Sequence, residues 1–581
     1  MHVLVPALAA FLYAAPPPDA GVAADASELV GLWGAERMLG PEVSGDLLIA
    51  RDRDGWLARI GPFEARAPAD GQRVHFELSG VRGEFRGQIE RGRLTGHWIQ
   101  PPTRLEGNRY ATPVTLAPDG HGAFRGIVRP KEDRISLYLL VRREPDGTLS
   151  GFVRNPERNL GVRWRTIRIE KSGDQVVLRP GREGQPPLLG KLSNGPVLSL
   201  FVPDIGTTLD FTRRGPGEAV GFEPRAGVPG PYAWRRPGES NDGWRTAAPT
   251  EVGLDQTLLA ALVQRVLDTR TEGLATPYVQ AILIARRGKL VLDEYFYGFD
   301  AERPHDSRSA GKSFGTTLVG IAIDRGVLSL DAKLVALLGQ PGRPFAHPDE
   351  RKDRIRLADA ISMSTGLSCD DNDDASPGNE DRMQVQESQP DWYRYMLDLP
   401  MVRPPHEKAF YCSGGINLGG AAVAATTQTW LPDYFRRNLA EPLAFGRYYF
   451  NLMPTGEGYL GGGLFLRPRD HLKLAQLFLD GGRWRGKQIV SGRWVKAATS
   501  PQASINGPDD YGFGWWLISY PYKGRTVRAF HTSGNGGQMA IAIPELELAV
   551  VFQAANYNNF PVWSKFRDEW LPQYVIGAVK N

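Results

Sequence analysis

The sequence predicts a multidomain protein with an all-β barrel in its N-terminal part and a mixed α/β domain in its C-terminal part. The chain has 581 residues, more than one hydrophobic core usually supports. It contains 67 glycines and 45 prolines without a repeating period, which favours tight turns and β-structure. Short runs of alternating apolar and polar residues fill the first third, and longer helical patterns appear only later.

Charge and composition exclude several classes of function. Lys and Arg number 69 against 65 Asp and Glu, so the net charge is only +4 and nucleic acid is not an expected partner. Two cysteines, Cys369 and Cys412, allow at most one disulfide and no cysteine-based zinc site. The nine histidines show no metal-ligand spacing, so we expect no metal and no other cofactor.

Residues 1–24 have the pattern of a secretory signal peptide. The apolar run Val3–Ala15 is too short to span a membrane, and the small residues before Asp25 suit a signal-peptidase cut. No other segment is long and apolar enough for a transmembrane helix. We therefore expect export to the periplasm or beyond, where the two cysteines could pair; the alternative is a frayed N-terminal tail.

Residues 25–214 are predicted to form the barrel, loosely similar to lipocalin-like accessory domains. Two stretches, Gly83–Gly96 and Gly122–Gly151, share a Phe-Arg-Gly core and a Leu-Thr/Ser-Gly end, and we interpret them as related hairpins of one barrel. The strongest strand patterns are Asp46–Ala50, Val74–Leu78, Ser136–Val141 and Gln175–Leu178.

A linker rich in Pro and Gly, residues 215–249, leads to a second domain at residues 250–581. A helix is predicted over 254–267, followed by a hairpin of two strands at 279–285 and 289–296. Helical patterns continue to about residue 479. Strands then return at 514–519, 527–530, 538–543 and 548–552, before a closing helix at 560–578. Strands at both ends of the segment indicate one sheet built from its two termini.

Three overlapping catalytic patterns occur between His305 and Gly326. The tripeptide Gly311–Ser313 lacks the earlier glycine and the leading strand of a phosphate-binding loop. Gly311–Gly315 fits a nucleophile elbow centred on Ser313, but polar residues precede it where a buried strand is needed. The third pattern is Ser309-x-x-Lys312. Its two residues share one face of a helix, where burial would lower the pKa of the lysine and make it a base for the serine.

Further segments occur in the order found in one family of enzymes. They are Gly288–Phe296, Ser309–Ser313, Ile361–Leu367, Tyr411–Ser413, Gly461–Leu466, Tyr511–Trp516 and Gly534–Gln538. On these residues the sequence resembles the β-lactamase and penicillin-binding-protein-like serine hydrolases, in particular the class C branch. That branch also holds family VIII carboxylesterases, D-amino-acid peptidases and aminohexanoate-dimer hydrolases. The resemblance implies an antiparallel sheet flanked by helices, with a helical subdomain, and it implies Ser309 as nucleophile.

Two further site elements follow from the resemblance. Tyr411 matches the family tyrosine, and a neighbouring Lys312 would favour its phenolate as general base. Ser413 stands where the family has Asn, which makes β-lactam hydrolysis less favourable because a hydroxyl cannot replace the two-ended amide contact.

The strand motif Lys-Thr-Gly also departs from the family pattern. In one alignment Thr532, Ser533 and Gly534 match the lysine, threonine and glycine of the motif. A shift of one residue places His531 at the position of the lysine instead. The site would then lack the fixed charge that recognises a substrate carboxylate. The resemblance also implies an oxyanion hole made by the backbone N–H groups of Ser309 and of the strand near Gly534.

Between these elements lies an acidic loop, Cys369–Asp381. It fails the calcium-loop pattern, and we interpret it as a solvated loop near the site entrance that a Cys369–Cys412 disulfide could attach to the site; free buried thiols are the alternative. Together the residues predict a serine hydrolase that acts through an acyl-enzyme on small esters or amides. The alternatives are a catalytically silent protein that binds a cell-wall or small-molecule ligand, and a D-aminopeptidase or β-lactamase.

Overall fold

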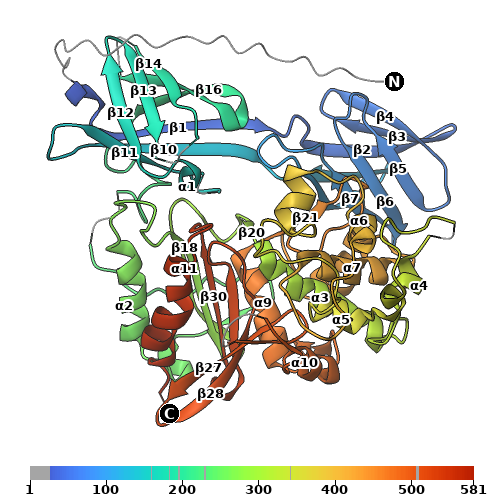
Figure 1. Cartoon of the computed structure of the whole chain (residues 1–581). Helices are drawn as coiled ribbons and strands as arrows, with labels where there is room; N and C mark the ends of the chain where they lie inside the picture. Colours follow the sequence, from blue (N-terminus) through green and yellow to red (C-terminus); the bar gives the residue numbers. More distant parts are fainter. Residues whose placement is uncertain are drawn as a thin grey trace.

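The computed structural model describes residues 26–580 apart from 159, 182–183, 194–195, 228–229, 341 and 506–508. The predicted signal peptide, residues 1–24, lies outside the described residues. Two β-rich units lie side by side on one face of a larger α/β unit, with β12–β16 in one and β2–β6 in the other (Figure 1). Within the described residues, no helix has the length and apolar character needed to cross a membrane.

The predicted N-terminal barrel is confirmed. Eight antiparallel strands close on themselves, and their inward side chains, among them Trp33, Leu139 and Phe211, form its core. The strands are β1 (Gly31–Gly40), β10 (Asp133–Arg143), β11 (Leu149–Arg154), β12 (Ile167–Ser172), β13 (Gln175–Pro180), β14 (Leu188–Leu192), β15 (Val197–Val202) and β16 (Thr207–Arg213). The short helix α1 (Gly161–Trp164) follows β11.

A second β unit is inserted between the first two barrel strands. Its strands are β2 (Gly45–Asp52), β3 (Gly55–Ile60), β4 (Phe63–Pro68), β5 (Arg73–Glu77), β6 (Glu84–Glu90), β7 (Arg93–Ile99), β8 (Arg109–Pro118) and β9 (Ala123–Val128). The two similar stretches are therefore not hairpins of one barrel: Gly83–Gly96 belongs to β6 and β7, whereas Gly122–Gly151 runs from β9 into the barrel. Strands β6, β7 and β9 share the sheet of this second unit, whereas β10 and β11, in the later part of the second stretch, belong to the barrel.

The second unit is joined directly to the α/β unit. Strand β8 pairs with β21 (Tyr449–Leu452), which pairs with β22 (Leu464–Leu466), which in turn pairs with β20 (His305–Asp306). A continuous hydrogen-bonded ladder thus runs from the N-terminal part to the residues that precede Ser309.

The predicted sheet built from both termini of the C-terminal domain is confirmed. Its order is β17-β19-β18-β30-β29-β28-β27-β26-β25, and every neighbouring pair except β17 with β19 is antiparallel. Strand β18 is buried on both faces, because its side chains alternate between two hydrophobic cores. The bounds are β17 (Arg245–Thr246), β18 (Val279–Arg286), β19 (Lys289–Tyr295), β25 (Ala503–Ser504), β26 (Asp510–Tyr511), β27 (Trp516–Tyr522), β28 (Arg525–His531), β29 (Met539–Ile543) and β30 (Leu548–Ala554).

Helices cover both faces of this sheet. On one face lie α2 (Gln256–Leu267), α11 (Phe560–Lys565) and the π-helix Phe566–Ile576. On the other lie α3 (Gly311–Asp324), α9 (Pro468–Leu479) and α10 (Gly492–Ala498), together with a helical subdomain. That subdomain contains α4 (Leu334–Leu338), α5 (Leu357–Ile361), α6 (Trp392–Asp398), α7 (Ser413–Thr427) and α8 (Leu431–Phe435). The apolar run of α3 packs against α7, so the start of α3 is held between sheet and subdomain.

The Pro- and Gly-rich segment before β17 packs on the α/β unit. Trp244 is buried and its indole N–H donates to the carbonyl oxygen of Arg469. The Asp242 carboxylate forms an ion pair at 3.2 Å with the guanidinium of the same arginine, on α9. These two contacts fasten the Pro- and Gly-rich segment to α9.

Candidate active site

Ser309 lies in a tight turn between β20 and α3. The turn Arg308–Ala310 is a 3-10 helix that leads directly into α3, and the Ser309 side chain is partly exposed. Arg308 has a φ of 48°, an unfavourable backbone conformation for a residue with a side chain. Its guanidinium is held by Asp306 at 2.8 Å and lies 4.9 Å from the ring centroid of Tyr557. These contacts fix the backbone next to Ser309.

Lys312 points back to Ser309 from the first turn of α3. Its Nζ donates to Ser309 Oγ at 2.9 Å and also to the carbonyl oxygen of Gly461. The side chain is 1% exposed, as the helical spacing predicts. The pKa, however, moves opposite to the prediction. Burial lowers it, but Tyr411 and two nearby carboxylates outweigh burial, so the pKa of Lys312 is raised. Lys312 is therefore cationic near neutral pH.

Tyr411 completes this group of side chains. It precedes α7, and its ring centroid lies 5.0 Å from Lys312 Nζ, so the ammonium group faces the aromatic ring. The ring also stacks on Trp516 of β27, with centroids 5.9 Å apart and planes 20° apart. The structure thus brings together Ser309, Lys312 and Tyr411 from the two elements that the sequence pattern indicated.

Ser313, the alternative nucleophile, occupies a different environment. Its side chain is 1% exposed and its hydroxyl donates to the carbonyl oxygen of Gly514. A nucleophile must be reachable by substrate, so this serine serves the packing of α3 against the sheet.

Ser413 faces two carboxylates. Its hydroxyl lies 2.7 Å from Asp371 Oδ2 and 3.1 Å from Glu380 Oε2, and its backbone N–H donates to Asp371 Oδ2 at 2.7 Å. The acidic loop, predicted to be solvated, therefore places two of its side chains inside the site, where they contribute to the pKa of Lys312. Sequence reasoning missed both. The signal that could have found Asp371 is the disulfide, because it brings the residue two positions after Cys369 next to the residue after Cys412.

The predicted disulfide between Cys369 and Cys412 is present, with Cα atoms 5.6 Å apart. The chain on either side of it is also paired, because the Asp371 backbone N–H donates to the Tyr411 carbonyl oxygen at 2.7 Å. The bridge thus attaches the acidic loop to the segment that carries Tyr411 and Ser413.

The strand residues do not provide a cation. His531 is 1% exposed, and its burial, with a smaller effect of Arg567, lowers the pKa of its imidazole to about 3. The Thr532 hydroxyl accepts from the Ala540 backbone N–H at 2.9 Å and lies 3.1 Å from His471 Nε2. Neither position therefore replaces the charge of the family lysine.

Gly534 and Ser533 follow β28 and approach the Ser309 turn. A Cβ at Gly534 would overlap the carbonyl oxygen of Ser307, so the glycine permits close approach of two chain segments. Its own backbone N–H donates to the Gln538 carbonyl oxygen at 2.8 Å, so Gly534 itself does not supply the oxyanion donor predicted from the strand near it. Ser533 is partly exposed beside it.

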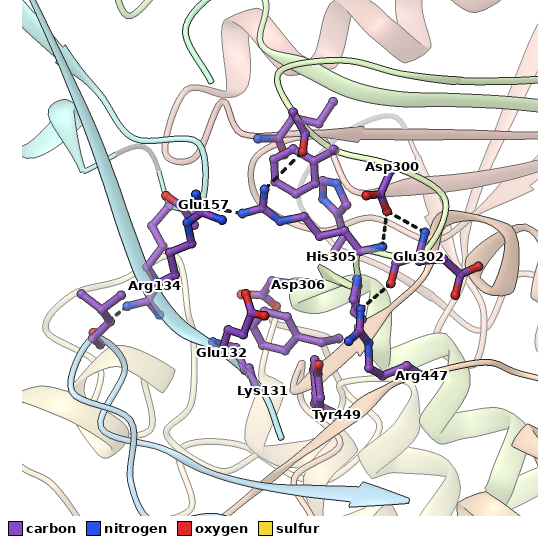
Figure 2. A pocket seen from close by; sticks show the side chains of 18 of the residues that line it. Lys131, Glu132, Arg134, Glu157, Asp300, Glu302, His305, Asp306, Arg447 and Tyr449 are labelled. Carbon is purple, nitrogen blue, oxygen red and sulfur yellow. Dashed lines mark hydrogen bonds and ion pairs between the residues drawn. The ribbon is translucent and has the colours of Figure 1, made fainter. Parts of the chain in front are cut away.

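A polar cavity of about 320 Å³ lies between the N-terminal units and the α/β unit (Figure 2). His305 and Asp306, which precede the Ser309 turn, line it, whereas Ser309, Lys312 and Tyr411 do not. Arg134 and Glu157 come from the N-terminal part, and Glu302, His305 and Arg447 from the α/β unit (Figure 2). A volume of this order accommodates a small ligand.

The described residues contain one group of side chains with metal-ligand geometry, formed by His75, Glu77 and Glu84 in the second β unit. Glu84 already accepts from the guanidinium groups of Arg86 and Arg109, so cations of the chain itself satisfy its carboxylate. We assign no metal to this group.

These features define a serine hydrolase fold with a Ser-x-x-Lys site, and comparison with known proteins identifies its family. Residues 259–562, which are 304 of the 581 residues, match the family model described as Beta-lactamase. The chain therefore belongs to the β-lactamase family.

Individual relatives are distant. A 6-aminohexanoate-dimer hydrolase of Paenarthrobacter ureafaciens is 24% identical over 306 residues, which cover 50% of this chain and 72% of that protein. A family VIII carboxylesterase structure is 15% identical with a TM-score of 0.41, covering 54% of this chain and 93% of its own. A penicillin-binding protein homologue of Caulobacter crescentus is 16% identical with a TM-score of 0.40, covering 54% and 92%.

Proposed function

We propose that the protein hydrolyses small esters or amides through an acyl-enzyme formed on Ser309. The observation that carries this proposal is the contact of 2.9 Å between Ser309 Oγ and the buried Nζ of Lys312, with the ring of Tyr411 beside that Nζ. A partly exposed hydroxyl next to a buried ammonium and a phenol has the parts that an activated nucleophile requires.

The charge of Lys312 assigns the roles of the three side chains. A protonated lysine cannot accept a proton, so the base is Tyr411 in its phenolate form, which the neighbouring Lys312 ammonium stabilises. This phenolate accepts the proton of Ser309 during attack and becomes a neutral phenol. The tyrosine then returns the proton to the leaving group. The backbone N–H of Ser309, at the start of α3, stabilises the developing oxyanion. Water releases the acyl group by the same proton route.

The charges of the site favour uncharged substrates over penicillin-like ones. His531 is neutral at neutral pH, and Asp371 and Glu380 add negative charge close to Ser413. A substrate carboxylate would therefore meet no fixed cation on the strand and would be repelled from the loop. An ester or amide lacks this cost.

The test is hydrolysis of p-nitrophenyl acetate and butyrate by the wild type, Ser309→Ala and Ser313→Ala. Ser309→Ala should lose about 10³-fold or more in kcat/KM, since the nucleophile is absent. Ser313→Ala is the matched control on the same helix and should retain activity. A fluorophosphonate probe should label the wild type and not Ser309→Ala. Equal hydrolysis by Ser309→Ala and the wild type would refute the proposal.

A substrate panel separates the alternatives. Short-chain esters, D-amino-acid amides and nitrocefin should be assayed on one preparation, with esters or amides expected to react fastest. Absence of both hydrolysis and probe labelling would instead indicate a catalytically silent protein that binds a ligand.

We also propose that the protein is exported. The Cys369–Cys412 disulfide supports this, because such bonds persist in oxidising compartments. Cell fractionation with N-terminal sequencing of the mature chain tests it, and an intact N-terminus on a cytosolic protein would contradict it.

A further inference from the structure

The carboxyl groups of Asp371 and Glu380 both contact the hydroxyl group of Ser413. If both carboxyl groups are ionised, the single hydroxyl hydrogen is too few for the two hydrogen bonds. Ser413 Oγ carries a single hydrogen, yet it lies within hydrogen-bond distance of Asp371 Oδ2 (2.7 Å) and Glu380 Oε2 (3.1 Å). A hydroxyl can donate to only one of them. The other contact is a hydrogen bond only if that carboxyl group is protonated and donates to Ser413 Oγ.

The remaining oxygens of the two carboxyl groups already have donors. Asp371 Oδ1 accepts from the Glu380 backbone N–H at 2.9 Å. Glu380 Oε1 accepts from the hydroxyl of Tyr459 and from Gln384 Nε2 at 3.2 Å. The missing proton therefore belongs between the carboxyl groups and Ser413.

We propose that Asp371 and Glu380 are positioning residues of the active site, which share one proton through the Ser413 hydroxyl and give Lys312 a single counter-charge. This inference rests on the proposed function. The two residues act through others: they brace the segment of Tyr411 and Ser413, and they keep Lys312 cationic.

The electrostatic surroundings agree with one shared proton. Burial and the charge of Glu380 raise the pKa of Asp371, against the opposing effects of Lys312 and Ser413. Two carboxylates this close seldom both ionise at neutral pH. The titratable groups that face the pair are Lys312 from α3, Arg308 from the Ser309 turn, and Tyr459. Tyr411 lies behind Lys312, against its Nζ. With one shared proton, the pair and Lys312 carry no net charge.

The experiment measures kcat/KM for an ester against pH in the wild type, Asp371→Asn, Glu380→Gln and the double variant. The wild type should show an ionisation well above the ordinary range of a carboxyl group, because loss of the shared proton adds negative charge beside Tyr411. Each single variant should lose this ionisation, since its one remaining carboxylate is charged throughout. The double variant leaves Lys312 without a counter-charge, so the ammonium favours the Tyr411 phenolate more strongly. The acid limb of its pH–rate profile should therefore move down by about 1 to 3 pH units.

Asp374→Asn is the matched control, because Asp374 is an exposed acid of the same loop. Its profile should match the wild type. A double variant whose acid limb stays in place, or single variants that keep the ionisation, would overturn the proposal.

Infrared difference spectroscopy tests the shared proton without catalysis and without relying on any one variant to fold. The spectrum of wild-type protein between pH 5 and pH 9 should contain the C=O band of a protonated carboxyl group, which persists in Ser309→Ala and disappears in Asp371→Asn. If the band is found but no ester is cleaved, the proposed function fails and the pair stands. If esters are cleaved and no such band exists, the pair fails.

Discussion

Removing the Cys369–Cys412 disulfide is expected to destabilise the catalytic domain by about 4 kcal/mol. The bridge links residues 43 positions apart, and closing a loop of that length removes chain entropy worth about 4 kcal/mol from the unfolded state. For a domain of about 330 residues, this corresponds to a decrease in Tm of about 6 °C.

The variant is Cys369→Ser combined with Cys412→Ser, and the measurement is differential scanning calorimetry with and without dithiothreitol. Reduced wild type and the double variant should unfold at the same lowered temperature, and the double variant should not respond to the reductant. Ester hydrolysis should fall as well, because the bridge holds Asp371 against the segment of Tyr411. A wild-type transition that is insensitive to reductant, together with an unchanged Tm in the double variant, would refute this reasoning.

Two further predictions concern close contacts outside the catalytic group. Gly534→Ala should lower kcat/KM by about 10-fold or more, because the new Cβ displaces the carbonyl of Ser307 beside the nucleophile. Gly238→Ala is the control, because a Cβ there meets no atom, and it should leave kcat/KM unchanged. Equal rates in the two variants would contradict the prediction. Burial raises the pKa of the Glu106 carboxyl, but Lys131 and a neighbouring arginine hold it at about 2, below the unfolded value of 4.5. The stabilisation that the Glu106 carboxylate contributes is therefore complete above about pH 4.5 and is lost as the pH falls toward 2. Glu106→Gln should lower the free energy of unfolding by about 3 kcal/mol at pH 7. Acid-unfolding curves of variant and wild type that run parallel would argue against this prediction.

The β-structure shows which parts of the fold the sequence could predict. Alternating side chains identified individual strands such as β10 and β13, because that period is local. The choice of partner is not local: β1 pairs with β10 across about ninety residues, and the intervening strands form a separate unit that continues into β21. No pattern within a strand encodes such pairing, so one barrel was predicted where two units exist.

The site divides in the same way. Ser309 and Lys312 are three positions apart, so helical geometry alone predicted their contact. That geometry also predicted burial of the lysine but gave the wrong sign for its pKa shift, because the shift depends on charges contributed by other segments.

The two carboxylates illustrate this limit most clearly. Asp371 and Glu380 belong to a run of acids that composition alone indicates to be solvated, and several of its members, such as Asp374, are exposed. What distinguishes the pair is that their carboxyl groups contact the Ser413 hydroxyl in space. In the sequence, Asp371 and Glu380 lie 42 and 33 positions from Ser413. The disulfide creates that proximity by joining Cys369 to Cys412. The acidic loop therefore acquires its place in the site from a covalent link, and the same link explains why loss of the bridge should affect both stability and catalysis.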